Sequence, residues 1–230
     1  MPTFNTPEPI RATITVAAGE VAIVAGDRAD TVVTVEPYDP AQPTDIEAVQ
    51  EVDIGYTEAD GLWVRQGHPW RYRYLGEPPP GTVSITVRLP TGSEVRGRAY
   101  LGTIRSEGLL GACEFSASSG RLQLAEIGGD LRARNRNGSI LVQRADANVD
   151  AKTNVGNIVV GEVARGTVDL ATDIGEVEVG VRPGTGVDLS AHSKLGRVLN
   201  RLPAENGTAS ASTVKIRART SLDDIIIRRS

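Results

Sequence analysis

Along most of the chain, apolar side chains alternate with polar ones over stretches of about five residues. Each stretch follows a small residue, usually glycine, in the pattern Gly-x-apolar-x-apolar. Apolar residues two apart are typical of a β-strand with one buried face, whereas a helix places them three and four apart. The pattern therefore predicts short strands joined by tight corners. The main glycines are Gly102, Gly120, Gly138, Gly156, Gly175 and Gly196.

These glycines recur at a nearly constant interval. Their spacings are 18, 18, 18, 19 and 21 residues, and a second anchor lies about halfway along each interval. A fixed period indicates one small unit stacked on copies of itself. Two strands per unit predict a flattened, right-handed β-solenoid, in which equivalent strands of successive coils pair in parallel. An antiparallel meander of nine-residue hairpins is the alternative. The second anchors are Gly111, Gly129, Ala147, Gly166 and Thr185.

The corners of such coils have their own requirements. Glycine suits them because it tolerates positive φ and close backbone approach. Apolar residues that directly precede several anchors are expected to fill the corners from inside. These residues are Leu101, Leu110, Val155, Ile174 and Leu195.

Outside the repeats the pattern is less regular. Residues 1–90 are predicted to form an irregular β cap with one short helix at Asp45–Glu51, because Thr44-Asp45-Ile46-Glu47 has the form of a capping box. Residues 91–204 carry the repeats. Residues 205–230 are predicted to add capping strands that close the stack and protect its open edge. We expect one continuous all-β domain.

Composition narrows the class of protein. Of the 230 residues only 4% are aromatic, so the core is aliphatic, and the net charge of −4 gives no attraction to nucleic acid. No apolar run approaches the ~20 residues that span a bilayer, and the first residues lack the features of a secretory signal. We expect a soluble, cytoplasmic protein with no membrane insertion. The single cysteine, Cys113, is expected to be a buried apolar side chain.

Several segments together carry a resemblance. They are the opening Gly19-Glu-Val-Ala-Ile-Val24, the strand Thr31–Val35, the Asp45–Ala48 helix, the strand Gly61–Val64 and Val87-Arg-Leu-Pro-Thr-Gly-Ser93, which leads into the repeats. In these features the chain resembles a family of bacterial β-strand-repeat proteins of unknown function, generally labelled "putative adhesin". The resemblance covers nearly the whole chain and implies a β-solenoid fold. It supplies no catalytic residues.

The residues themselves indicate no catalytic machinery. His68 and His192 lie far apart in the sequence, and no nucleophile elbow, phosphate-binding loop, dinucleotide fingerprint or zinc-ligand spacing occurs. We therefore predict no enzyme, no catalytic residue and no cofactor. Trp70-Arg-Tyr-Arg-Tyr74 mixes aromatic and basic residues, and its alternation predicts buried rings and solvated arginines.

Two sets of outward positions are candidate sites. Asp150, Asp169 and Asp188 occupy the same position in successive predicted coils, where they either repel one another in screening solvent or form a weak divalent-cation site. Leu141 and Val159 are outward and adjacent on the other face. They are either covered by the N-terminal cap or form a partner surface.

These observations predict a non-enzymatic structural or binding protein, an adhesin-like β-repeat scaffold. Its partner is expected to be a protein or a glycan, and the chain itself a monomer or small homo-oligomer. A self-assembling β-helical scaffold is one alternative. A carbohydrate-active β-helix enzyme is another, which rests on analogy of fold and requires an acidic cleft.

Overall fold

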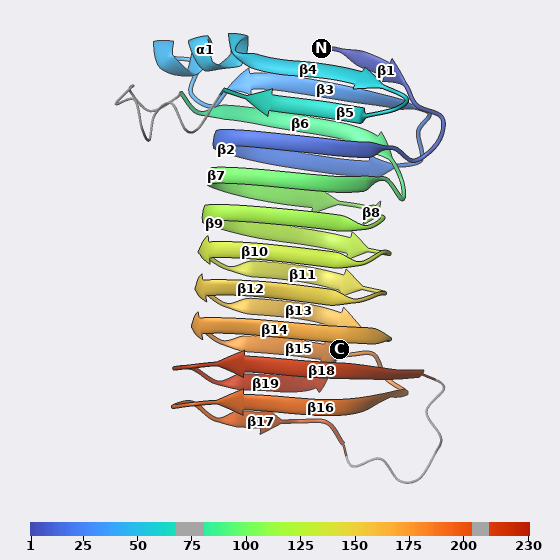
Figure 1. The fold of residues 1–230 in the computed structure, drawn as a ribbon, viewed down its shortest axis with the longest axis vertical. Coiled ribbons are helices and arrows are strands. Elements are labelled where there is room, and N and C mark those ends of the chain that lie inside the picture. Colours follow the sequence, from blue (N-terminus) through green and yellow to red (C-terminus); the bar gives the residue numbers. More distant parts are fainter. Residues whose placement is uncertain (68–80, 204–211) are drawn as a thin grey trace.

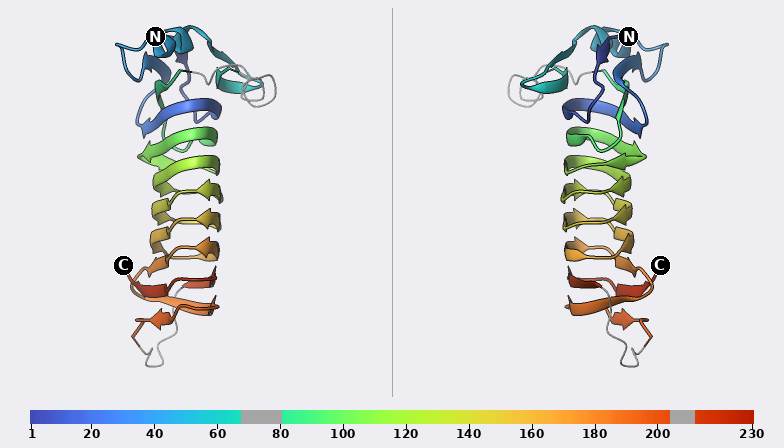
Figure 2. Two further views of the ribbon diagram at one scale, coloured as in Figure 1. Left: turned by 90° about the vertical axis from the view of Figure 1, so that its left-hand side faces the viewer. Right: turned by 90° about the vertical axis from the view of Figure 1, so that its right-hand side faces the viewer.

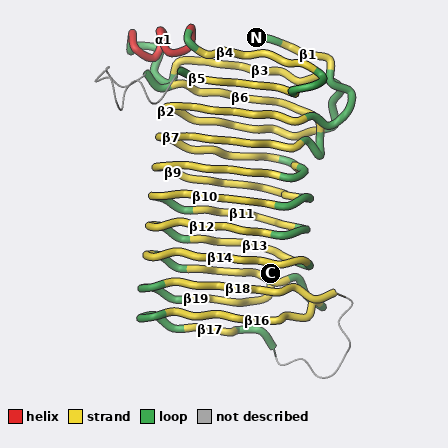
Figure 3. The backbone as a smooth tube through the Cα atoms, viewed as in Figure 1, coloured by secondary structure: helices red, strands yellow, loops and turns green. Residues whose placement is uncertain are grey.

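The computed structural model describes residues 1–67, 81–203 and 212–230, and most of them lie in strands (Figures 1 and 3). The first strands are β1 (Thr3–Asn5), β2 (Arg11–Gly26), β3 (Asp30–Pro37), β4 (Val52–Thr57), β5 (Gly61–Gln66) and β6 (Val83–Pro90), with helix α1 (Pro43–Gln50) between β3 and β4. The middle strands are β7 (Glu94–Glu107), β8 (Leu109–Leu110), β9 (Cys113–Ile127), β10 (Leu131–Asn137), β11 (Ile140–Ala145), β12 (Val149–Val155) and β13 (Ile158–Val163). The last are β14 (Gly166–Ile174), β15 (Val177–Val181), β16 (Thr185–Ser193), β17 (Val198–Asn200), β18 (Ser212–Thr220) and β19 (Ile225–Arg229). The prediction of an all-β chain is confirmed.

Strands in the repeat region pair with the equivalent strand one unit away. Leu131 of β10 lies opposite Val149 of β12, and Ile140 of β11 lies opposite Ile158 of β13. These pairings are parallel. Antiparallel pairs within the described ranges join β1 to β3, β3 to β6 and β4 to β5, all near the N-terminus. The antiparallel meander is therefore wrong for the repeats.

The paired strands form two facing layers (Figure 2). One layer runs through β4, β5, β2, β7, β9, β10, β12, β14, β18 and β16. The other runs through β1, β3, β6, β2, β7, β9, β11, β13, β15, β19 and β17. The long strands β2, β7 and β9 belong to both because each passes through a corner. The predicted inward positions, such as Leu122, Leu124, Ile140 and Val142, are buried between the layers.

The glycine corners stack directly on one another. Gly138 has a φ of 133°, and a Cβ at this residue would lie 1.7 Å from the carbonyl oxygen of Gly120. A Cβ at Gly120 would likewise lie 1.6 Å from the carbonyl oxygen of Gly102. Both the backbone conformation and the close approach therefore require glycine. The row continues through Gly156 and Gly175.

A row of polar side chains lies just inside these corners, and we call its members the corner donors. Each donates a hydrogen bond to the corner carbonyl of the neighbouring unit, as Thr153 Oγ1 does to the Gly138 oxygen at 3.1 Å. These bonds satisfy carbonyl groups that would otherwise be buried without a partner. The others are Asn135 to Gly120 at 2.9 Å, Thr172 to Gly156 at 3.0 Å, Thr220 to Gly175 at 2.9 Å and Ser193 to Asp223 at 2.9 Å.

Most apolar residues directly before the glycines do not fill the corners. Leu101, Val155, Ile174 and Leu195 are 56%, 45%, 45% and 77% exposed, contrary to expectation, and Leu110 of this set is buried. The inward place at each repeat corner is taken by the residue three before the glycine. The residue directly before the glycine then lies outside the turn.

The C-terminal strands do not close the stack, which corrects the prediction for residues 205–230. Strand β18 lies between β14 and β16, and β19 lies between β15 and β17 (Figure 1). The terminal unit is therefore formed by β16 and β17, although they precede β18 in the chain. Ion pairs on either side favour this order: Arg217 Nη1 lies 3.5 Å from Asp169 Oδ1, and Lys215 Nζ lies 3.5 Å from Asp188 Oδ2.

The N-terminal boundary also differs from the prediction that residues 1–90 form the cap. Strand β2 pairs in parallel with β7 across both layers, and Gly19 has a φ of 149° like the repeat glycines. Residues 11–26 are thus a unit of the stack itself. The segment Gly19-x-Val-x-Ile23 carries the repeat pattern that signals this role.

The helix begins two residues earlier than predicted and has no capping box. Its N-cap is Gln42, with no hydrogen bond from a capping side chain. The Asp45 carboxylate instead accepts hydrogen bonds from the backbone N–H groups of Asp39 at 3.0 Å and Thr82 at 2.7 Å. Asp45 therefore ties α1 to the start of β6. Within the described ranges, no helix has the length and apolar character required to cross a membrane.

Replacing a stacked glycine is expected to be severely destabilising. Gly138→Ala should lower the free energy of unfolding by about 3 kcal/mol or more, because the new methyl group meets backbone and φ is unfavourable. Urea unfolding followed by circular dichroism measures this loss. Gly26→Ala is the control, since a Cβ there meets nothing within 4 Å. Equal losses in the two variants would contradict the stacking argument.

Removing a corner donor is expected to have a smaller, distinct effect. Thr153→Val keeps the shape of the side chain but leaves the Gly138 carbonyl without this donor, which should cost about 1 kcal/mol. Thr34→Val is the matched control, because the Thr34 hydroxyl is buried without a hydrogen-bond partner among the described residues. It should leave the free energy of unfolding unchanged or raise it. The reverse ranking of the two variants would refute the role given to the donors.

Candidate functional site

The structure brings together two of the three predicted acidic residues. Asp150 of β12 lies opposite Asp169 of β14, but β18 separates Asp169 from the strand that carries Asp188. In β16 it is Ser190, not Asp188, that shares the column of Asp169, through Arg217. The row of three carboxylates does not form.

The register of β16 explains this shift. The interval from Gly175 to Gly196 is the longest, and its extra residues lie between Val181 and Val187, around the turn at Gly184, where φ is 79°. The corner donor Ser193 fixes the other end of the strand. Counting forward from Thr185 therefore misplaces Asp188 by two residues.

Each of these carboxylates has basic partners. Asp150 accepts a short hydrogen bond from Arg134 Nη2, and Lys152 Nζ lies 3.6 Å from its other oxygen. Burial alone would raise the pKa of Asp150, but the hydrogen bond and the charges of Arg134 and Lys152 hold it below its ordinary value. Within the described residues no group of three or more acidic, histidine or cysteine side chains could hold a metal ion. The arrangement is one of ion pairs.

Cys113 and His192 lack the setting of catalytic groups. Cys113 is 5% exposed, and burial raises the pKa of its thiol to about 12, so the thiolate nucleophile is not formed near neutral pH. His192 lies opposite Arg219 on the exposed side of β16. His68 and the Trp70–Tyr74 segment lie outside the described residues.

Leu141 and Val159 form an outward aliphatic pair, of which Val159 is half-buried. They lie opposite each other on β11 and β13, and Leu141 is 37% exposed. Gln123 of β9 and Glu178 of β15 flank them in the same column. The N-terminal elements pair with β2, several units away, so the expectation that the cap covers this pair is wrong.

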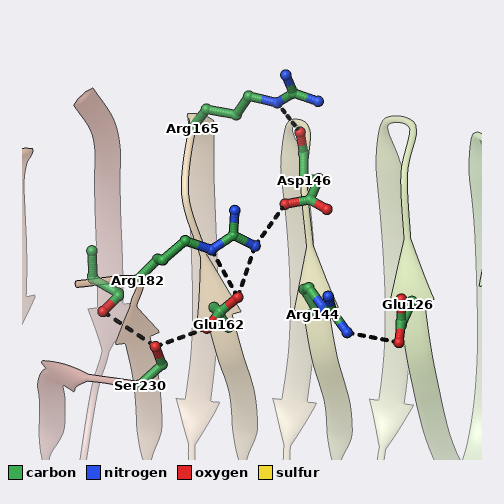
Figure 4. A network of polar contacts seen from close by, with 8 residues as sticks. Glu126, Arg144, Asp146, Glu162, Arg165, Arg182 and Ser230 are labelled. Atoms are coloured by element: carbon green, nitrogen blue, oxygen red, sulfur yellow. Dashed lines mark hydrogen bonds and ion pairs between the residues drawn. The ribbon is translucent and has the colours of Figure 1, made fainter. Parts of the chain in front are cut away.

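A network of ion pairs that the sequence reasoning missed runs along one edge of the stack (Figure 4). Arg182 donates to Glu162 Oε1 from Nε at 2.9 Å and from Nη2 at 2.8 Å, and its Nη2 also lies 3.2 Å from Asp146 Oδ1. In the two preceding units, Arg144 Nη2 of β11 donates to Glu126 Oε1 of β9 at 2.7 Å. Glu126, Arg144, Glu162 and Arg182 recur at nearly the repeat interval with alternating sign, which is the signal that could have revealed them.

Ser230 and Arg165 add two further hydrogen bonds to the network. Ser230 Oγ donates to Glu162 Oε2 at 2.9 Å, and Arg165 Nε donates to the Asp146 carbonyl at 2.5 Å. The hydrogen bonds from Arg182 hold the pKa of Glu162 below its ordinary value, and those to Glu162 raise the pKa of Arg182. Since Arg144 and Arg182 each pair with a carboxylate of a neighbouring unit, the network ties units together.

Comparisons with known proteins show a likeness of fold. No family model matches the sequence, and no curated protein matches it. A crystal structure of a "putative adhesin" from Bacteroides fragilis is similar, with a TM-score of 0.50 and 12% identity over 98% of this chain and 95% of that one. A "putative cell adhesion protein" from Clostridium sporogenes has a TM-score of 0.44 and 11% identity, over 100% of this chain and 98% of that one. The chain shares an all-β fold with the first of these.

The edge network predicts a pH dependence of stability. Arg182→Met should lower the free energy of unfolding by about 1 kcal/mol at neutral pH, as expected for a partly exposed ion-pair network. Because the folded-state pKa of Glu162 is depressed, its stabilisation is present above its ordinary value of 4.5 and is lost as the pH falls through the folded-state pKa. Urea unfolding of both proteins at about pH 7 and about pH 3 measures the difference.

The control for this experiment is Arg136→Met, since Arg136 makes no ion pair with a described residue. It should match the original protein at both pH values. A gap between Arg182→Met and the original protein that persists unchanged at low pH would rule out the ionic origin.

Proposed function

We propose that this protein is a non-enzymatic binding scaffold, built as a flattened, right-handed β-solenoid, and that its partner is another protein. The observation that carries the proposal is the outward Leu141–Val159 pair, with Leu141 exposed and Val159 half-buried, in the middle of a flat, regular layer. The likeness of fold to a structure titled as an adhesin supports a binding role of this kind.

The chemistry of this layer favours a protein partner over a glycan. Its outward column runs Arg105, Gln123, Leu141, Val159 and Glu178, so polar residues flank the aliphatic pair, and it continues through Ile226 to Leu199. Protein interfaces commonly combine an apolar centre with a polar rim. Aliphatic side chains attract in proportion to the area they bury, without directional preference.

The enzymatic alternative has less support. A glycosidase needs a pair of carboxyl groups that are free to exchange protons across a cleft. Asp150 is bound to Arg134, Asp169 lies near Arg217 and Asp188 lies near Lys215.

The partner surface is tested with a double variant, Leu141→Lys together with Val159→Lys. We expect it to fold like the original protein, because Leu141 is exposed and Val159 only half-buried. Used as bait in affinity purification from the native host, it should lose at least tenfold of a specific protein that the original retains. Mass spectrometry identifies that protein, and calorimetry with the purified pair measures the loss.

A matched control is available on the neighbouring edge. Val155 and Ile174 also lie opposite each other on adjacent strands, and each is 45% exposed. Val155→Lys with Ile174→Lys should retain the partner. Loss of the partner by both double variants, or by neither, would reject the Leu141–Val159 surface.

A further inference from the structure

Among the described residues, the strands β16 and β17 have open edges at the end of the stack. Strand β16 pairs with β18 and β17 pairs with β19, and no other described strand lies along their far edges. Such an edge presents unpaired N–H and C=O groups that can pair with another chain. At the opposite end, antiparallel strands and α1 continue the structure beyond β2 (Figure 1).

The inner side chains at this end are incompletely covered. Ile216 and Ala218 of β18 are fully buried, whereas Leu189 and Ala191, their neighbours in β16, are only half-buried. Val198 of β17 is 42% exposed beside the buried Ile225 of β19. Leu202 packs against the core from beyond β17 and still leaves these side chains partly open. This end is therefore an incompletely covered apolar surface, with strand edges that no other described strand pairs with.

Charged groups along β16 suit a second copy of the same strand. Asp188 lies near the start of the strand, and Lys194 directly follows its end. In an antiparallel pair centred on Ala191, Asp188 lies opposite the partner's Lys194, and Lys194 opposite the partner's Asp188. Opposite charges facing each other across a strand pair are favourable. Leu189 then shares the inner side with the partner's Ser193.

We propose that this end is a dimer interface, at which the β16 strands of two copies pair antiparallel across a two-fold axis. The apolar end surfaces of the two copies then pack against each other and bury Leu189, Ala191 and Val198. Because the other end carries different elements, the contact joins like ends and produces a closed dimer rather than a filament. This inference does not depend on the proposed binding function, which uses a different surface.

The molecular mass of the protein in solution tests the interface. Light scattering over a concentration series to about 100 µM should show a dimer at the upper end. Val198→Lys should keep the circular dichroism spectrum of the original protein. It should raise the dimer dissociation constant at least tenfold, because it places a charge in the buried apolar interface. Leu141→Lys is the control. It also replaces an apolar residue by lysine but lies on the side of the stack, so it should remain dimeric.

Several results overturn the interface. They are a monomer at every concentration, a dimer that Val198→Lys leaves intact, and a mass that grows without limit. If the protein is a monomer, the open edge is instead available to pair with a strand from a different protein. If Val198→Lys does not fold, Lys194→Asp serves instead, since it reverses an exposed charge and should weaken the dimer by like-charge repulsion.

A cross-link tests the two-fold pairing itself. Directly opposed residues of an antiparallel pair have Cα atoms about 4.5–5.5 Å apart, which suits a disulfide. Ala191→Cys should therefore give a disulfide-linked dimer under mild oxidation, resolved on a non-reducing gel. Leu141→Cys is the control and should remain uncross-linked, and Cys113 is buried in both variants. Equal cross-linking of the two variants, or none by Ala191→Cys, overturns the pairing.

Discussion

The close stacking of one corner on the next is the constraint on which the rest of the structure depends. At Gly120 and Gly138 the backbone of one unit approaches the carbonyl of its neighbour so closely that a side chain is excluded. That approach sets the distance between units and keeps the strands in parallel register. Once register is fixed, inward residues such as Ile140 and Ile158 fall into continuous buried columns. The aliphatic core follows from the corner geometry.

A tight corner also creates a polar cost, which the corner donors offset. A carbonyl that turns inward at the corner is removed from water and needs a hydrogen bond. Thr153 and Thr172 provide it from the inward position three residues before the glycine. Ser193 and Thr220 make the same bond in the last two units, so all these units use one device. Polar residues inside an otherwise aliphatic core are thus part of the repeat.

Sequence alone predicted the unit more successfully than the order of the units. Alternation and spacing revealed the strands, the buried columns and the repeat length, because each depends on local periodicity. The place of β18 and β19 depends on contacts distant in the chain, and it could not be inferred from periodicity. Segment 212–230 carries five basic and two acidic residues, and it lies where Asp169 and Glu178 on one side and Asp188 on the other face it. Charge complementarity selects among positions that the apolar pattern leaves equivalent.

The same distinction separates the candidate sites. Leu141 and Val159 lie well within the regular part of the stack, where counting along the repeat places residues correctly, and the structure finds them adjacent as predicted. Asp188 lies beyond the irregular interval and the inserted strands, where counting fails. Outward positions carry no constraint from the core, so their character is free to reflect what the surface contacts. An aliphatic pair kept outward among polar neighbours is therefore the more informative departure, because neither the corners nor the core requires it.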